Sequence, residues 1–303
     1  MTDTKIFGAD VVARFFRASN SKLFYIDNIV VEKLLKVILK LSSIVYQRNK
    51  PSKGSQGQLV VIDNFDSSIK MCIDISRSMG AAIYWTGFHE FREFLFLHRF
   101  LKPEMVFIDV GANQGEYTLF AAKRLTNGKV LPFEPLPSIL KLLRQNIEVN
   151  RFANIEVYEC GLSDRNEQLN IFEIDDAHEG LATFFPGSRK KGIEYSVPLR
   201  RLDDIVAERK IERLDFIKLD IEGGELKALL GAAESIEQFK PVVMIEINKE
   251  TYTAAGYSVD DVKEFFTRRS YKAFELQKRG QLKECQSLPD FGNIVFRFEE
   301  RAG

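Results

Sequence analysis

Residues 106–124, VFIDVGANQGEYTLFAAKR, decide the fold. The opening run, 106–110, is apolar and rich in β-branched residues, as is typical of a buried strand. A glycine turn, Gly111–Gly115, follows, and a helix is predicted near Glu116 to Arg124. The stretch therefore predicts a strand that passes through a tight turn into a helix, the unit from which parallel sheets are built.

The same alternation continues along the chain. Strands are predicted at 129–134, 154–160, 215–220 and 241–247, and helices near 139–149, 203–209 and 225–233, with a longer excursion over 164–200. This order predicts an α/β fold with a doubly wound, mainly parallel sheet and helices on both faces. Near the end, Ser258 and Asp261 are expected to cap a helix. Residues 271–276 and 293–298 are expected to pair antiparallel at the sheet edge.

The region before residue 57 has a different character. A helix is predicted over 29–45, with an apolar face of Val31, Leu34, Leu35, Ile38, Leu41 and Val45 and an opposite face of Lys33, Lys36 and Lys40. We expect this helix to pack on the main domain or on a partner subunit, with contact to a membrane surface as the alternative. A linker is predicted at 49–57 and a β-hairpin over 58–74. The predicted domains are 1–56, a helical extension with its linker, and 57–303.

Composition excludes several classes of protein. Of the 303 residues, 45% are apolar and 28% charged, so a disordered or collagen-like chain is excluded. Lysine plus arginine equals aspartate plus glutamate at 43 each, which gives no global field to attract nucleic acid. Residues 1–100, however, carry 14 basic and nine acidic side chains. Any attraction to anionic surfaces should therefore lie near the amino end.

Cysteine usage and the terminus predict a cytoplasmic protein. Cys72, Cys160 and Cys285 lie far apart, without the spacing of a zinc site or a disulfide framework. The first 20 residues lack the apolar core of a signal peptide. The longest apolar stretch, 29–45, is interrupted by charges, so no spanning helix is expected.

Polar residues and glycines follow the predicted strands, at the edge of the sheet where doubly wound folds bind their ligands. In the turn Gly111–Gly115, Asn113 occupies the place of the middle glycine of a dinucleotide fingerprint, so a nucleoside without pyrophosphate fits better. Glu134, at the next strand end, can accept both ribose hydroxyls. Leu162, Ser163 and Asp164 follow the third strand, where they could meet an adenine.

Acidic residues follow the later strands. Asp220 and Glu222 straddle a strand end and a glycine turn, and Glu246 ends the next strand. As single residues these acids are as readily helix caps or solvated charges as catalytic groups. Their position at adjacent strand ends favours a shared crevice.

These segments also resemble the FkbM family of S-adenosylmethionine-dependent methyltransferases. The similar motifs are IYWTGFHEFREF (83–94), FIDVGANQGEYTLFAAK (107–123), FEP (133–135), VPLRRLDDI (197–205), FIKLDIEGGELKALLGA (216–232) and MIEIN (244–248). The resemblance covers about residues 70–300 and implies transfer of a methyl group to a hydroxyl of a sugar, glycolipid, polysaccharide or related natural product. The implied cofactor site comprises Glu90, Asp109, Gly111, Ala112, Asn113, Gly115, Glu134, Pro135, Leu162, Ser163 and Asp164. Gln114 departs from the family, which commonly has an aliphatic residue there.

For such a reaction the catalytic candidates are Asp220, Glu222 and Glu246, because an aliphatic hydroxyl must lose its proton as the new bond forms. Glu90 and His89 are further candidates for the base, and we prefer Asp220 or Glu222. Three alternatives stay open. A divalent metal could bind Asp220, Glu222 and Asn248; the ligand could be a nicotinamide; or the fold could serve only as a binding scaffold.

Overall fold

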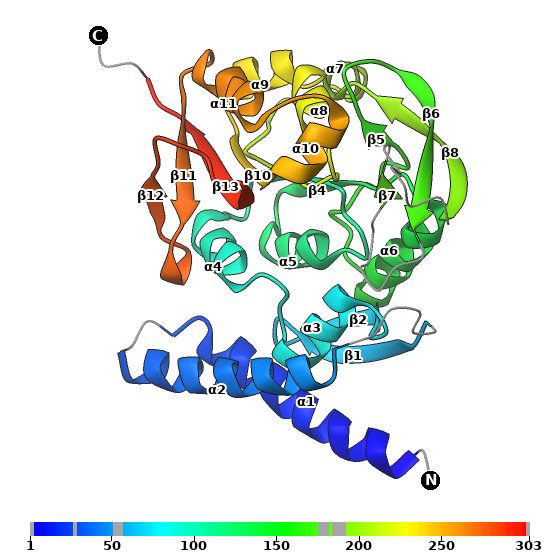
Figure 1. The fold of residues 1–303 in the computed structure, drawn as a ribbon, viewed down its shortest axis with the longest axis vertical. Coiled ribbons are helices and arrows are strands. Elements are labelled where there is room, and N and C mark those ends of the chain that lie inside the picture. The colour runs from blue at the N-terminus through cyan, green and yellow to red at the C-terminus, as the bar shows by residue number, and fades with distance from the viewer. Residues whose placement is uncertain (1–2, 27–28, 51–56, 175–181, 184–191, 301–303) are drawn as a thin grey trace. The chain divides into compact units, whose positions relative to one another are not determined.

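The computed structural model describes residues 3–26, 29–50, 57–174, 182–183 and 192–300. Backbone contacts divide the chain into two compact units. The first comprises the described residues up to 95 together with 148–151, and the second comprises 96–147, 152–174 and the described residues beyond 180. Figure 1 labels the elements of both units. The predicted linker falls mostly on 51–56, outside the described residues.

The first unit combines three helices with a β-hairpin. Its elements are α1 (Asp3–Leu23), α2 (Ile29–Arg48), β1 (Leu59–Phe65), β2 (Ile69–Asp74) and α3 (Ser78–Thr86). The predicted hairpin is confirmed, with β1 and β2 antiparallel. The predicted helix is confirmed as α2, which packs against α1 and α3. Helix α1 was not predicted from the sequence.

Arg17 fastens α1 to the rest of the first unit. Its side chain is 2% exposed, and its guanidinium donates to Asn64 Oδ1 at 2.8 Å and to the carbonyl oxygen of Tyr84 at 2.6 Å. A buried cation requires such partners, because an unpaired charge in the interior is costly. Beside it, Phe88 stacks on Phe24 with ring centroids 4.8 Å apart. These contacts join α1 to the hairpin and to α3.

The second unit is built on a mixed seven-stranded sheet in the order β12-β11-β13-β10-β9-β3-β4. The parallel strands are β3 (Val106–Val110), β4 (Lys129–Phe133), β9 (Phe216–Leu219) and β10 (Val242–Asn248). The antiparallel strands are β11 (Tyr271–Leu276), β12 (Leu282–Glu284) and β13 (Phe291–Phe298). The predicted α/β fold with an antiparallel C-terminal edge is confirmed. Because β4, β3 and β9 run parallel, their carboxyl ends lie at the same end of the sheet. The strand order reverses at β3, which lies between β4 and β9.

Helices cover both faces of this sheet. They are α4 (Phe91–Phe100), α5 (Glu116–Arg124), α6 (Pro137–Asn150), α7 (Leu202–Arg209), α8 (Glu225–Leu230), α9 (Ala233–Phe239), α10 (Lys249–Ala255) and α11 (Val259–Thr267), with a short 3₁₀ turn η1 (Lys278–Gly280). On one face, Ile108, Ile217 and Ile245 pack in a core with residues of α7, α8, α9 and α11. On the other face, Phe107 stacks on Phe216 at 5.0 Å, and Phe100 of α4 lies 5.5 Å from Phe216.

Two helix predictions have different outcomes. The helix predicted over 225–233 is divided into α8 and α9 at Gly231, whose carbonyl oxygen accepts the backbone N–H of Asp203 from outside the helix. A Cβ at Gly231 would lie 1.9 Å from the carbonyl oxygen of Ser163. The predicted cap of α11 is confirmed as a full capping box between Ser258 and Asp261. None of the helices in the described part of the chain is long and apolar enough to cross a membrane.

The segment predicted as a strand at 154–160 makes only two isolated parallel bridges to β4, Val130 to Ile155 and Phe133 to Tyr158. The reason is Pro132, which lies between them and has no N–H to donate. Hydrogen bonds still join the two segments on either side of it. The excursion after residue 160 forms a separate sheet in the order β5-β8-β6-β7, from β5 (Gly161–Leu162), β6 (Glu167–Ile174), β7 (Ala182–Thr183) and β8 (Gly192–Arg200).

Candidate functional site

The glycine turn after β3 lies against the ends of both neighbouring strands. The backbone N–H groups of Gly111 and Ala112 donate to the carbonyl oxygen of Phe133 at 3.0 and 3.1 Å. Gly111 has φ +78°, and a Cβ there would lie 2.0 Å from the carbonyl oxygen of Asp220. Only glycine fits such a position. The turn therefore connects the end of β4 with the end of β9.

Glu134 connects β4 to the same turn. Its carboxylate is 6% exposed; Oε2 accepts the backbone N–H of Asn113 and Oε1 that of Leu136, each at 3.0 Å. Burial raises the pKa of Glu134 to about 7, although the two N–H donors oppose that shift. Asn113 itself has φ +51°, an uncommon conformation outside glycine. The structure thus brings together Asn113, Glu134 and Pro135, three of the predicted cofactor residues.

A buried polar row lies under the turn, between the sheet and α5. Asp109, fully buried, accepts a hydrogen bond from Thr118 Oγ1 at 2.6 Å and is paired in register with Lys218 of β9. Lys218 Nζ lies 3.1 Å from Asp220 Oδ2 and 4.9 Å from the ring centroid of Tyr117. Burial raises the pKa of Asp109, and Lys218 opposes that shift. The ammonium of Lys218 therefore forms an ion pair with Asp220, and its charge also favours the ionised form of Asp109.

The turn after β9 is held by a carboxyl group from α8. Glu225 is 1% exposed and accepts the backbone N–H groups of Ile221 and Gly223, both at 2.9 Å. The hydroxyl of Tyr257 donates to the same carboxyl group at 3.1 Å. Burial raises the pKa of Glu225 to about 7. These bonds fix a turn in which Glu222 has φ +52° and Gly223 φ +103°.

The predicted catalytic acids lie at this edge. Asp220 has a side chain 31% exposed and Glu222 is half-buried. Burial, followed by the charge of Asp220, raises the pKa of Glu222 to about 7. The parallel register pairs Ile245 with Leu219, so Glu246 follows at the level of Asp220. Glu222 has a left-handed backbone, which is often found at functional sites when the residue is not glycine.

Asn248, a possible metal ligand by its place in the sequence, caps α10: its side-chain oxygen accepts from the backbone N–H of Thr251 at 3.4 Å. Within the described ranges, no group of three His, Cys, Asp or Glu side chains is arranged to hold a metal ion.

The remaining predicted cofactor residues, 162–164 and Glu90, differ in burial and in the compact unit to which they belong. A Cβ at Gly161 would lie 3.8 Å from Pro135 Cγ, so the start of 161–164 lies beside the end of β4. Leu162 and Ser163 are buried, whereas Asp164 is half-buried and accepts a hydrogen bond from Ser163 Oγ at 3.1 Å. Glu90 is half-buried in the first compact unit.

The sequence suggested no role for Lys218 or Glu225, and the hydrogen bond from Tyr257 to Glu225 was not predicted. For Lys218 a signal was present, because a lysine interrupts the strand FIKLD, which is apolar on both sides. A charge in a strand covered on both faces requires a partner. No comparable signal marked the contact of Tyr257, which reaches Glu225 from 32 positions away in the sequence.

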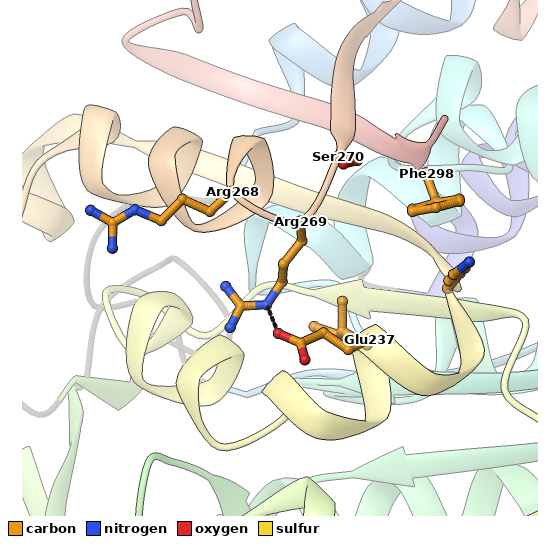
Figure 2. A pocket seen from close by; sticks show the side chains of 7 residues that line it. Glu237, Arg268, Arg269, Ser270 and Phe298 are labelled. Atoms are coloured by element: carbon orange, nitrogen blue, oxygen red, sulfur yellow. Dashed lines mark ion pairs between the residues drawn. The ribbon is translucent and has the colours of Figure 1, made fainter. Parts of the chain in front are cut away.

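The second unit also has a pocket that is not lined by any of the predicted site residues. It encloses about 200 Å³ and is lined by Ile236, Glu237, Lys240, Arg268, Arg269, Ser270 and Phe298. Figure 2 shows Arg269 pointing toward Glu237, with which it forms an ion pair at 3.0 Å. Lys240 precedes β10, whereas Glu246 lies near its far end. The pocket is therefore at the opposite edge of the sheet from the glycine turn.

A family model covers the region that contains the residues around the glycine turn. A model of the FkbM methyltransferase domain matches residues 109–273, which include the glycine turn, Glu134 and the Asp220 turn. The 2-O-methyltransferase NoeI of Sinorhizobium fredii is 24% identical over 164 residues, covering 50% of this chain and 67% of that protein. The 31-O-demethyl-FK506 methyltransferase FkbM of Streptomyces tacrolimicus is 28% identical over 162 residues, covering 45% and 62%.

Among solved structures, methyltransferase FkbM from Methylobacillus flagellatus KT aligns with 87% of this chain and 60% of its own, at 16% identity and a TM-score of 0.45. The chain spans less than two thirds of the length of several of the curated relatives that it matches.

Proposed function

Because the chain belongs to the FkbM family of S-adenosylmethionine-dependent methyltransferases, we propose that it methylates a hydroxyl oxygen of a sugar, glycolipid, polysaccharide or related natural product. Two relatives support oxygen as the acceptor atom, since the names of NoeI and of the FK506 enzyme specify O-methyl groups. The observation that carries the proposal is the meeting of three strand ends at Gly111: the turn bonds to β4 through Phe133, and it packs on Asp220 after β9.

The residues at this edge fit the cofactor. Each oxygen of Glu134 accepts one backbone N–H, and a carboxylate oxygen can accept a second hydrogen bond. Both ribose hydroxyls can thus donate to Glu134 without displacing the bonds that hold the turn. Asn113, in the place of the middle glycine of a dinucleotide fingerprint, suits a nucleoside rather than a dinucleotide. The proposed cofactor residues are Glu134 and Gly111–Gly115, with Asp164 toward the adenine.

S-adenosylmethionine supplies an electrophilic methyl carbon when it is bound. The chain has to hold the acceptor oxygen in line with that carbon and remove its proton. Asp220 is the proposed base, because it extends from the rigid end of β9 and its carboxylate is partly accessible. Lys218 holds this carboxylate at 3.1 Å and keeps it in one orientation.

Glu222 is the second candidate for the base. Its pKa, raised to about 7, suits a group that exchanges protons near neutral pH. The two candidates differ in their support: Asp220 is held by Lys218, and the backbone that carries Glu222 is held by Glu225. Asp220→Asn and Glu222→Gln, each made alone, show which of the two acids the reaction requires.

The test of the function compares cells with and without the protein. Glycans and lipids extracted from both are analysed by mass spectrometry, and we expect a methylated species that is absent without the protein. Complementation with Asp220→Asn should not restore it, while the purified Asp220→Asn protein should still bind S-adenosylmethionine with only modestly reduced affinity by calorimetry. Full restoration by Asp220→Asn would remove Asp220 from the role of base and leave Glu222.

Calorimetry also tests the non-catalytic alternative. A wild-type protein that binds no S-adenosylmethionine would contradict the enzyme proposal and favour a scaffold. Methyl transfer that stops on exhaustive chelation and returns with a divalent ion would instead favour the metal-assisted reaction.

A further inference from the structure

Helix α2 has an apolar row on its surface in addition to the face that it buries. Leu34, Val37, Leu41 and Ile44 are between 41% and 55% exposed, and Val30 is 70% exposed. The predicted single apolar face is therefore divided: Ile38 is buried, whereas Leu34 and Leu41 face outward. Isolated exposed apolar residues are ordinary, but a continuous row marks an interaction surface.

The exposed row forms a single stripe along the helix. Successive members are three or four positions apart, and each residue advances about 100° around an α-helix, so they lie one above another. The buried residues Ile38 and Ser42 lie on one side of this stripe and face α1 and α3. Lys33 and Lys40, both exposed, lie on its other side. Figure 1 shows α2 as a long, straight helix, which gives the stripe an unbroken length.

The charge pattern identifies the partner. Over Ile29–Arg48 the sequence contains four basic residues and one acid. If a second copy packed antiparallel on the stripe, Lys33 and Lys40 would face the same lysines of the other helix, and like charges would oppose pairing. In a parallel pair they would face Ile38 and Val45, which offer no opposite charge. An anionic bilayer, in contrast, can accept the stripe at its acyl boundary and the lysines at its headgroups.

We propose that α2 docks this protein on anionic membranes, lying in the interface with Leu34, Val37, Leu41 and Ile44 inserted and Lys33 and Lys40 on the headgroups. The first unit is suited to present the helix rigidly, because α1, which packs along it, is fastened by buried Arg17. The inference does not depend on the acceptor or on methyl transfer.

Sedimentation of the full chain with vesicles tests the proposal. We expect binding to vesicles of phosphatidylcholine mixed with phosphatidylglycerol, and little binding to phosphatidylcholine alone. Val37→Asp with Leu41→Asp should weaken binding at least about tenfold, because two apolar groups no longer enter the bilayer. Lys33→Gln with Lys40→Gln should weaken it roughly 30-fold at low salt, since each lysine near an anionic surface contributes about fivefold.

Matched controls lie on the hairpin of the same unit. Val61 is 67% exposed on β1 and Lys70 is exposed on β2, so Val61→Asp and Lys70→Gln make the same chemical changes away from α2. Both should bind vesicles like the wild type. Circular dichroism and calorimetry with S-adenosylmethionine verify that each variant is folded.

Two results would overturn the proposal. One is equal sedimentation of the wild type and the α2 variants with anionic vesicles, or no sedimentation of either. The other is a concentration-dependent dimer, seen by light scattering, that Leu41→Asp dissociates while vesicle binding is absent. That result would mean that the stripe binds a second copy of the chain and not a membrane.

Discussion

The backbone N–H of Asn113 donates to Glu134 Oε2 at 3.0 Å, which joins the turn after β3 to the end of β4. The same carboxyl group accepts from Leu136 through its other oxygen. We therefore propose two functions for Glu134. It shapes the turn in the free protein, and it offers its remaining lone pairs to the ribose of the cofactor.

Glu134→Gln tests whether the site requires the carboxylate, because glutamine has the same shape but is neutral. The amide retains one acceptor oxygen, and its NH₂ group faces an N–H donor, so one of the two backbone bonds is lost. We expect the affinity for S-adenosylmethionine to fall roughly ten- to hundredfold by calorimetry, as for the loss of a hydrogen bond to a charged group. Glu159→Gln is the control, because the side chain of Glu159 is 55% exposed and pairs with Arg144. Equal affinity in wild type and Glu134→Gln would contradict the ribose role.

Gly111→Ala tests the contact between the turn and β9. The added Cβ would lie 2.0 Å from the carbonyl oxygen of Asp220, at a backbone position with φ +78°. Gly256→Ala is a matched control: its φ is +86°, but a Cβ there meets no atom within 4 Å. We expect the control to lose about 1 kcal/mol of unfolding free energy from the left-handed backbone alone.

Gly111→Ala should lose roughly 3 kcal/mol, because overpacking against the backbone adds to that strain. Urea unfolding of both variants measures the difference. If the two losses are equal, then the turn and β9 are not in contact as described.

The ion pair between Lys218 and Asp220 can be measured by a double-mutant cycle. Lys218→Met should strongly destabilise the protein, because it removes the cation from beside Asp109 and Asp220. In the background of Asp220→Asn the same change should cost less, with a coupling of about 1 kcal/mol between the two positions. Denaturant unfolding of the four proteins gives this value. The ion pair of Lys272 and Glu284, in which both side chains are exposed, should show weaker coupling. A coupling of zero for Lys218 and Asp220 would mean that they do not interact.

The extent to which sequence predicts this fold depends on how local the cause is. The run VFIDV and its glycine turn predict β3 and the start of α5, because apolar patterning and glycine act within a few residues. The capping box of Ser258 and Asp261 is equally local. The position of β13 between β10 and β11 is not, since it depends on pairings over about 20 to 50 residues and leaves no mark in either strand.

The same distinction applies to the site. Glu134 and Asp220 were recognisable because each directly follows a strand. Glu225 stands in the quoted motif, yet its function is to accept N–H groups from a turn whose shape depends on Glu222 and Gly223 adopting left-handed backbone. Sequence patterns do not specify such backbone angles at a non-glycine residue. The division of α2 between a buried face and an exposed stripe likewise depends on how α1 and α3 pack.

The buried carboxyl groups of the site predict how stability depends on pH. Burial raises the pKa of Glu225 to about 7, from a usual value of 4.5. Between these two pH values the folded protein holds a proton that the unfolded chain has released, so the unfolding free energy falls as pH rises through this range. The slope flattens above about 7, where both states are ionised. Glu134 and Glu222 act in the same direction.

Denaturant unfolding from pH 4.5 to above 7 tests this with Glu225→Gln, whose slope should be shallower by at most about 1 kcal/mol per pH unit. Tyr257→Phe is the control, because it removes the hydroxyl that donates to Glu225 but retains the titrating carboxyl group. It should lower stability while keeping a pH slope. A slope unchanged in Glu225→Gln would show that Glu225 is ionised throughout this range and that its two backbone bonds outweigh its burial.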